Sequence, residues 1–259
     1  MAAGTYSSKV IVLRKTKLGE SDLILNLLAE DGSALRAVAK GARKPSNAFA
    51  ARLELYSVAE VLCSKGRSLD IVQEARLMQA NGKLRSDLAY SAGAAPMAEL
   101  LDKVVQAGLS NPRLFDMTVA AFSCLDSAAL ETVPALTAAH LLKALAFVGL
   151  RPMLTACAVC GSPIAREDAG FLRLSYSEGG VLCDVCASQT GSIAVPSQVC
   201  GWAEALLSST FAQVCGYGLD VEGAFALLGL CKGYIHEHVG SSMKSLDFML
   251  ASGLYGPTR

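Results

Sequence analysis

Two pairs of cysteines constrain the fold of this chain more than any other feature. Each pair has the spacing Cys-x-x-Cys, and the pairs are Cys157 with Cys160 and Cys183 with Cys186. A tight turn lets both sulfurs of such a pair face one point, and tetrahedral Zn²⁺ takes four thiolates at about 2.3 Å. The gap between the pairs is slightly longer than the commonest one for such sites. The spacing therefore predicts a module built around one zinc ion.

The residues between the two pairs predict a hairpin that absorbs the extra length. Residues 171–176 read as a strand, and Gly179-Gly180 reads as the turn that follows. A four-thiolate site has no open coordination position for water or substrate, so it predicts a structural ion and argues against zinc catalysis. A site that has lost its metal and an intracellular redox pair remain alternatives.

Cysteine usage and hydropathy indicate the compartment. The N-terminus has no apolar core of signal-peptide length, and nine cysteines without such a signal indicate a reducing compartment. No apolar run reaches spanning length, so we expect no membrane helix and a cytoplasmic protein. The remaining cysteines are expected to be small buried hydrophobes; they are Cys63, Cys124, Cys200, Cys215 and Cys231.

The net charge of zero hides an asymmetry between the two parts of the chain. Residues 1–85 hold fourteen Lys/Arg and eight Asp/Glu, whereas residues 86–259 hold nine Lys/Arg and fifteen Asp/Glu. A basic N-terminal part joined to an acidic remainder predicts a polyanionic partner for the first part.

The basic part reads as five short strands. Asp31-Gly32 marks a hairpin turn between the second and third of them, and a polar loop from Gly41 to Phe49 follows the third, with a short helix expected near Ser46. This order predicts a small closed barrel of the OB-fold type, a fold that often binds single-stranded nucleic acid. The expected strands are 8–16, 22–29, 34–40, 53–64 and 69–74.

From residue 77 onward, apolar residues recur at the spacing of a helix. Pro96 is expected to kink or split the first helical segment. Asn111-Pro112 and Thr132-Val133-Pro134 are helix starts, and Ala187 to Ala194 reads as a link. Later helices are expected at 196–207, 218–238 and 242–250. The predicted fold class is therefore a multidomain α+β chain. Its parts are an OB-fold (1–80), a helical domain (81–152 and 194–259) and an inserted zinc module (153–193).

Two basic clusters in the barrel are candidate phosphate contacts. The stretch from Lys40 through Arg43 to Lys44 places three cations around a glycine at a barrel rim, where a loop can follow a nucleic-acid backbone. A solvated loop kept soluble by its charge is the alternative. Few aromatic residues accompany the clusters, so charge should dominate over base stacking. The other candidates are Arg14, Lys15, Lys17 and Arg52.

These motifs together resemble one family over essentially the full chain, the bacterial recombination and repair protein RecO. The matching stretches are residues 12–13, 19–22, 31–32, Ala39 to Lys44, and Leu150-Arg151-Pro152 leading into the first cysteine pair. The stretch from Ala39 is the most specific, because generic zinc-ribbon proteins lack it. Leu18 departs from the family pattern, where many relatives have an aromatic residue.

The resemblance implies a mediator without catalytic activity. RecO-like proteins bind single- and double-stranded DNA and anneal complementary strands. With RecR they load RecA onto DNA coated by single-strand-binding protein (SSB), whose acidic tail is a family partner. Two other classes remain open on the residues alone. One is a zinc-containing protein-interaction adaptor that does not bind nucleic acid. The other is a nucleic-acid-processing enzyme, for which no convincing carboxylate cluster or nucleophile is present.

Overall fold

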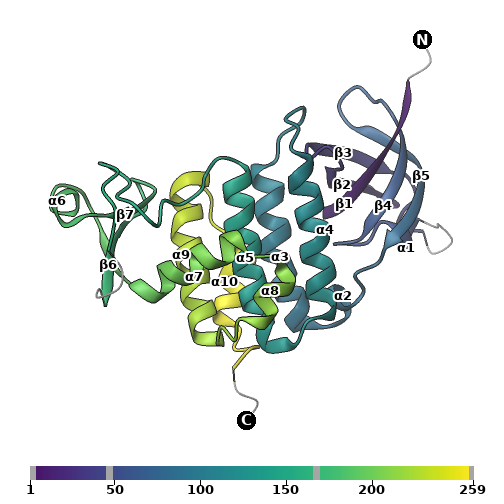
Figure 1. Ribbon diagram of the computed structural model, residues 1–259. Coiled ribbons are helices and arrows are strands. Elements are labelled where there is room, and N and C mark those ends of the chain that lie inside the picture. Colours follow the sequence, from purple (N-terminus) through teal and green to yellow (C-terminus); the bar gives the residue numbers. More distant parts are fainter. Residues whose placement is uncertain (1–3, 45–48, 166–169, 257–259) are drawn as a thin grey trace. The chain divides into compact units, whose positions relative to one another are not determined.

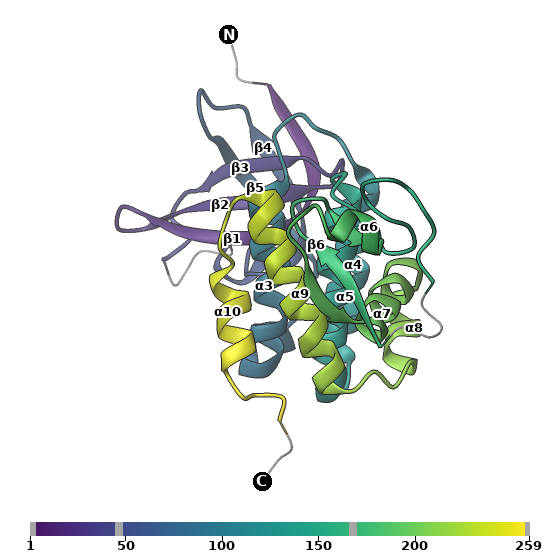
Figure 2. The same ribbon diagram turned by 90° about the vertical axis from the view of Figure 1, so that its left-hand side faces the viewer.

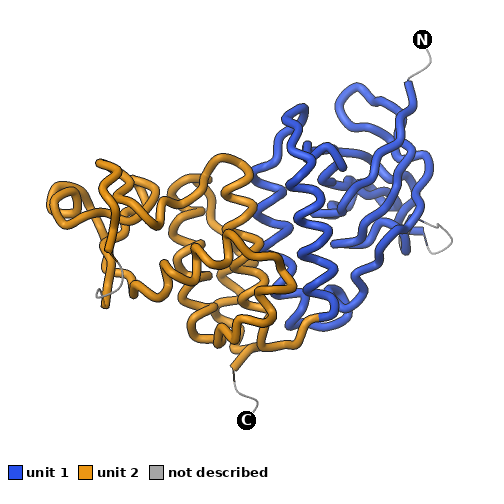
Figure 3. Tube along the Cα trace, in the orientation of Figure 1, with its two compact units in different colours: residues 1–127 blue, residues 128–259 orange. Residues whose placement is uncertain are grey.

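The computed structural model describes residues 4–44, 49–165 and 170–256. The chain forms two compact units, residues 1–127 and residues 128–259 (Figure 3). The four-part division expected from the sequence is not tested by these units and stays a prediction. No helix in the described ranges is long and apolar enough to cross a membrane.

Five strands form a closed barrel at the start of the first unit (Figure 1). They are β1 (Thr5–Leu18), β2 (Asp22–Ala29), β3 (Ala34–Ala39), β4 (Val58–Ser64) and β5 (Asp70–Gln79). Their order around the barrel is β1-β2-β3-β5-β4, and β3 runs parallel to β5 while the other neighbours are antiparallel. This arrangement confirms the predicted barrel.

The strands differ from the expected ones mainly at their ends. β4 begins at Val58 and not at Leu53, because residues 53–57 turn after α1 (Phe49–Arg52) and Tyr56 has a left-handed φ of 67°. β1 and β5 are longer than predicted. The helix expected near Ser46 begins, within the described residues, at Phe49; residues 45–48 of that loop lie outside them.

Alternation of apolar residues along the strands builds the barrel core. In β2, Leu23, Leu25 and Leu27 are buried inside the barrel, as expected for a period of two. A register shift in β1 between Val12 and Arg14 changes which face the following residues occupy. The apolar strands therefore close around their own core and leave their polar residues on the outside.

Three helices complete the first unit: α2 (Lys83–Ser86), α3 (Leu88–Val104) and α4 (Pro112–Ser127). Asp87 caps the start of α3, since its side chain accepts the Ala89 amide, and α3 packs against β1 and β2. Pro96 lies inside α3 without dividing it, so the expected split is wrong. Proline removes one amide donor from the helix, and the small residues Ala92 and Gly93 one turn earlier are buried in close packing that outweighs this loss.

The second unit has a helical part around α5 (Val133–Phe147). This helix is buried over most of its circumference and contacts α7 (Ser197–Ser208), α8 (Phe211–Gly216) and α9 (Val221–Val239). α10 (Lys244–Ala251) runs alongside α9 (Figure 2). The 3-10 turn η1 (Leu130–Thr132) precedes α5. α8 was not predicted, because its six residues are too few to show a helical period.

The rest of the second unit is a small module that carries the cysteines. Strands β6 (Phe171–Ser175), β7 (Gly180–Leu182) and β8 (Ile193–Pro196) form a sheet in the order β7-β6-β8, and α6 (Asp184–Ala187) follows β7. The hairpin predicted between the cysteine pairs is confirmed as β6 and β7. β8 was expected to be part of a link.

Two glycines bring the module close to its neighbours. A Cβ on Gly233 of α9 would lie 2.3 Å from the Tyr176 ring, so the ring of this hairpin residue packs where α9 has no side chain. A Cβ on Gly180 would lie 2.2 Å from the carbonyl oxygen of Met153. That close approach permits the bond from the Val181 amide to the same carbonyl at 2.9 Å. The Tyr176 ring thus packs the module against α9 of the helical part, and the backbone bond to Met153 closes the module itself.

Candidate metal centre and nucleic-acid surface

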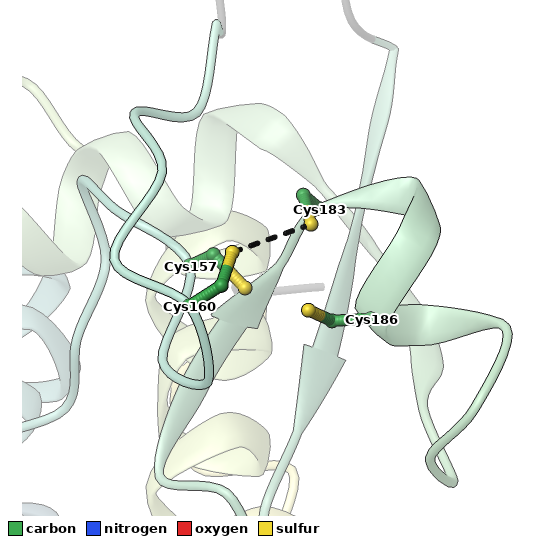
Figure 4. Close-up of side chains that lie close together, drawn as sticks. All are labelled: Cys157, Cys160, Cys183 and Cys186. Carbon is green, nitrogen blue, oxygen red and sulfur yellow. Dashed lines mark hydrogen bonds between the residues drawn. The ribbon is translucent and has the colours of Figure 1, made fainter.

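The four predicted cysteines meet at one point in the module. The sulfur atoms of Cys157, Cys160, Cys183 and Cys186 all lie within 4.8 Å of one another, and they point toward a common centre (Figure 4). The Cys160 and Cys183 sulfurs are 3.7 Å apart. Tetrahedral bonds of about 2.3 Å would place sulfurs about 3.8 Å apart. The cluster therefore fits a four-coordinate metal ion held by sulfur alone.

Two local structures present these sulfurs. After Cys157 the chain makes a tight turn, in which the Gly161 amide donates to the Cys157 carbonyl at 2.8 Å and Gly161 adopts a φ of 75°. Glycine tolerates that conformation without strain. Cys183 lies at the N-cap of α6, so the first helical turn brings Cys186 back toward it. Each Cys-x-x-Cys pair is therefore a preformed half of the site.

Hydrogen bonds bias the protonation of the cysteines. Backbone amides of Cys160 and Cys183 lower the pKa of the Cys157 thiol to about 6. A hydrogen bond with Ser162 lowers the pKa of Cys160. The bond with the Cys183 side chain raises the pKa of Cys186 to about 12. Thiolate is the form that binds metals, so the first pair is already biased toward a ligand while Cys186 must lose a proton on binding.

The basic loop after β3, residues 40–44, is held against the turn between β1 and β2. The Asp22 carboxylate accepts the Gly41 amide at 2.7 Å, and the Arg43 amide donates to the Ser21 carbonyl at 2.8 Å. The Gly41 amide, the Ser21 hydroxyl and the charges of Lys40 and Lys44 all lower the pKa of Asp22. Residues 19–22 and 39–44, which are separate motifs in the sequence, therefore form one structural unit. Asp22 was not among the predicted site residues.

The predicted cations divide into two groups. Lys17, Lys40 and Lys44 are exposed at the ends of β1 and β3. The four other cations have a named side-chain contact, namely Arg14 with Asp102, Lys15 with Glu54, Arg43 with the Gly19 and Glu20 carbonyls, and Arg52 with the Ala75 carbonyl, while the charges of Lys40 and Lys44 act on the Asp22 carboxylate.

This division changes what can be expected of individual residues. Lys15 is only 20% exposed and lies 2.8 Å from the Glu54 carboxylate, so it is poorly placed to reach a phosphate. Arg43 uses Nη1 for its two carbonyl bonds, and a guanidinium carries five N–H donors. Arg43 can therefore hold the loop and still face a phosphate. The role of each cation in binding stays a prediction.

Replacing Asp22 with asparagine is expected to loosen the basic loop. The contacts that lower the pKa of Asp22 stabilise the loop above the ordinary Asp pKa of about 3.9, and that stabilisation is lost as the pH falls through the lower pKa of the folded chain. The Gly41 amide proton should therefore titrate with Asp22 at acidic pH in an NMR experiment.

The Asp22→Asn chain should lose this titration, and its Gly41 resonance at neutral pH should move toward that of an unbonded amide. The control is Glu20→Gln, because Glu20 is an exposed neighbouring acid and its side chain is not bonded to the loop within the described residues. A Gly41 shift that is the same in the Asp22→Asn and unaltered chains would contradict the proposed contact.

The chain combines a closed five-stranded barrel that has a basic rim with helices and a four-cysteine module. These parts make it a multidomain α+β protein. The family model described as recombination protein O N terminal matches residues 1–81, and the one described as recombination protein O C terminal matches residues 85–247. The chain belongs to the recombination protein O (RecO) family. The predicted resemblance is thus confirmed, as is the predicted fold class.

Relatives named DNA repair protein RecO include proteins from three different bacteria. The protein of Desulfitobacterium hafniense is 37% identical over 199 residues, which cover 76% of this chain and 70% of that protein. The Bifidobacterium longum protein is 34% identical over 181 residues, or 69% of this chain and 73% of that protein. The Desulforamulus reducens protein is 28% identical over 252 residues and extends over 94% of this chain and 93% of its own length.

Proposed function

We propose that this chain is a DNA-binding recombination mediator in DNA repair that has no catalytic activity of its own. It anneals complementary single strands and, with RecR, helps to load RecA onto single-stranded DNA coated by SSB. The observation that carries the proposal is the basic loop held at the rim of a barrel in a chain of the RecO family. The relatives' name, DNA repair protein RecO, supports the same assignment.

Charge neutralisation is the proposed mechanism. Exposed cations at the barrel rim bind phosphates of single- and double-stranded DNA, which lowers the repulsion between two strands and favours their pairing. Lys17, Lys40 and Lys44 are the best placed for this role, because they are exposed at adjacent strand ends. Arg43 fixes the loop and adds its remaining donors. Arg14, Lys15 and Arg52 contribute to the positive potential while they are engaged with the protein.

The four-cysteine cluster is proposed to hold one structural Zn²⁺ ion. Four thiolates are a donor set that soft or borderline metals prefer, and the sulfur spacing supports tetrahedral binding. The ion would link the turn after Cys157 to the start of α6, and thereby stabilise a module whose sheet is small. The acidic SSB tail is proposed as a further partner of the helical part, in a nucleoid-associated cytoplasmic complex.

Annealing of SSB-coated strands tests this proposal most directly. Two complementary oligonucleotides, one labelled with a fluorophore and one with a quencher, are coated with SSB and mixed with and without the protein. We expect the protein to accelerate quenching at least several-fold at low salt, and less at high salt because phosphate contacts release counterions. Unchanged quenching together with no mobility shift on bare single-stranded DNA would refute the proposal and favour the zinc-containing adaptor without nucleic-acid binding.

A further inference from the structure

Two of the clustered cysteines belong to different pairs and lie in contact. The Sγ atoms of Cys160 and Cys183 are 3.7 Å apart, and Figure 4 shows this contact between the two halves of the site. Cys160 lies in the turn of the first pair, and Cys183 lies at the start of α6. A disulfide has an S–S bond of about 2.05 Å, so a movement of less than about 2 Å would bring these two sulfurs to bonding distance.

Backbone hydrogen bonds hold this contact in place. The Ala158 amide donates to the Val181 carbonyl at 2.8 Å, and this bond joins the turn of the first pair to β7. β7 ends directly before Cys183 and pairs with β6. No cysteine side chain takes part in these bonds. The backbone therefore keeps the two sulfurs close to each other without requiring a bound metal.

The four sulfurs differ in their access to solvent. Cys160 is exposed, Cys183 and Cys186 are half-buried, and Cys157 is buried. Oxidation of a cysteine follows its thiolate character and its exposure, and a cysteine that binds a metal does so as the thiolate. Cys160 is therefore the sulfur of this cluster that a dissolved oxidant reaches first, and Cys183 is in contact with it.

Cysteines in the cores of the chain are shielded from the same oxidant. Cys63, Cys200 and Cys231 are buried. Burial raises the pKa of Cys63 to about 11 and that of Cys231 to about 12, so both of these remain thiols at neutral pH. Because the thiolate and not the thiol is the nucleophile, an oxidant should react with the module before it reacts with these cores.

We infer that Cys160 and Cys183 are a peroxide-sensitive pair, in which oxidation replaces the metal site by a disulfide between the two halves of the module. The inference rests on the zinc site of the proposed function and adds a covalent modification to it. In a reducing compartment such a disulfide is transient and serves to sense an oxidant. The chemical class of the oxidant is a hydroperoxide, which is small and uncharged and needs no binding pocket.

The reaction has two steps. The Cys160 thiolate attacks one oxygen of hydrogen peroxide, the O–O bond breaks, and hydroxide leaves, so that Cys160 becomes a sulfenic acid. The Cys183 thiolate then attacks the Cys160 sulfur, the S–S bond forms, the S–O bond breaks, and a second hydroxide leaves. Each hydroxide takes up a proton and becomes water. The two sulfurs lose two electrons in total, and one peroxide accepts them.

The disulfide is incompatible with the closed metal site. It removes two thiolates and leaves Cys157 and Cys186, whereas a closed tetrahedral site takes four ligands. Oxidation is therefore expected to release the metal, while the new bond joins the turn of the first pair to the start of α6. A thiol reductant cleaves the disulfide and regenerates all four ligands, so the modification is reversible.

Peptide mapping of the full chain after treatment with hydrogen peroxide tests the inference. Free thiols are blocked, and the chain is digested with trypsin without reduction. Arg173 lies between the two cysteine pairs, so the enzyme separates them. We expect a disulfide that links the two resulting peptides, with fragment ions that assign it to Cys160 and Cys183. A chromophoric chelator should detect release of one zinc ion per chain in parallel, and dithiothreitol should remove the link.

Cys160→Ser and Cys186→Ser are matched variants, because each removes one thiolate from the same metal site. Cys186→Ser keeps Cys160 and Cys183 and should still form the link, whereas Cys160→Ser should lose it. Thermal melting confirms that each variant is folded. Equal yields of the link in both variants, or disulfides that form only within each pair of the unaltered chain, would overturn the inference.

Zinc content separates this inference from the proposed function. A chain that keeps both its zinc and its thiols in peroxide would overturn the oxidation site and leave the structural zinc intact. A chain that holds no zinc as purified, yet forms the link, would support the cysteine pair and refute the zinc site. Neither Cys160 nor Cys183 lies in the barrel, so DNA binding tests the proposed function independently of both outcomes.

Discussion

Replacing Cys160 with serine is expected to abolish binding of the proposed zinc ion and to lower the melting temperature by about 10 °C. Cys160 is exposed, so a serine of nearly the same shape has little packing cost of its own. Loss of a structural metal is among the changes that cost more than about 4 kcal/mol. For a protein of about this length, the melting temperature falls by about 2–4 °C for each kcal/mol lost from the free energy of unfolding. The change should be visible by calorimetry.

A chelator provides the control for this substitution. The unaltered chain should contain one zinc ion by elemental analysis, and chelation should lower its melting temperature to that of the Cys160→Ser chain. The variant should contain no zinc and should not respond to the chelator, because a ligand that binds only the folded state stabilises only the chain that holds it. A zinc-free variant with the melting temperature of the unaltered chain would contradict a structural role for the metal.

Replacing Lys40 and Lys44 with alanine is expected to weaken binding of single-stranded DNA by about 25-fold at 0.1 M salt, through a slope of log K against log salt that is smaller by about 1.4. Both lysines are exposed beside the Asp22 carboxylate, whereas Arg43 donates to two carbonyls that hold the loop. Keeping Arg43 leaves the loop bonded, so the loss reports charge and not loop geometry. The measurement is anisotropy of a labelled oligothymidylate over a range of salt concentrations.

The charge-matched control is Lys9→Ala/Arg76→Ala, which removes two exposed cations of the same barrel at positions that both pair across the strands with Glu60, and it should keep the slope of the unaltered protein. Arg43→Ala alone is expected to act differently, because it removes the bonds to the Gly19 and Glu20 carbonyls and so changes the loop itself. If the Lys40→Ala/Lys44→Ala chain keeps the unaltered slope of log K against log salt, the loop at 40–44 does not bind phosphates.

Features with a strong local signal could be predicted from the sequence. The hairpin turn at Asp31-Gly32 marked the boundary between β2 and β3, and residues 22–29 were predicted as a strand with the observed bounds. The helix start at Pro112 was also visible, because proline is suited to the first position of a helix. These signals depend on residues close together in the chain, so no knowledge of packing was needed.

Features that depend on packing were missed or misjudged. α8 and β8 are short and gain their stability from neighbours in the second unit, so neither shows a clear period of its own. Pro96 was expected to kink or split a helix, but α3 runs through it without a break, and the residues around it are buried. Local preference is weak in each case, and tertiary contacts outweigh it.

The sequence alone determined that four thiols could form one site and that the barrel would be basic, because cysteine spacing and charge are properties of the residues themselves. Only the tertiary structure decided which cations remain available. It paired Arg14 and Lys15 with carboxylates. It also placed Arg36 and Arg67 on the lining of one groove, because β3 pairs in parallel with β5. The physical reason is that a charge acts through its neighbours in space, and strand pairing sets those neighbours across long stretches of chain.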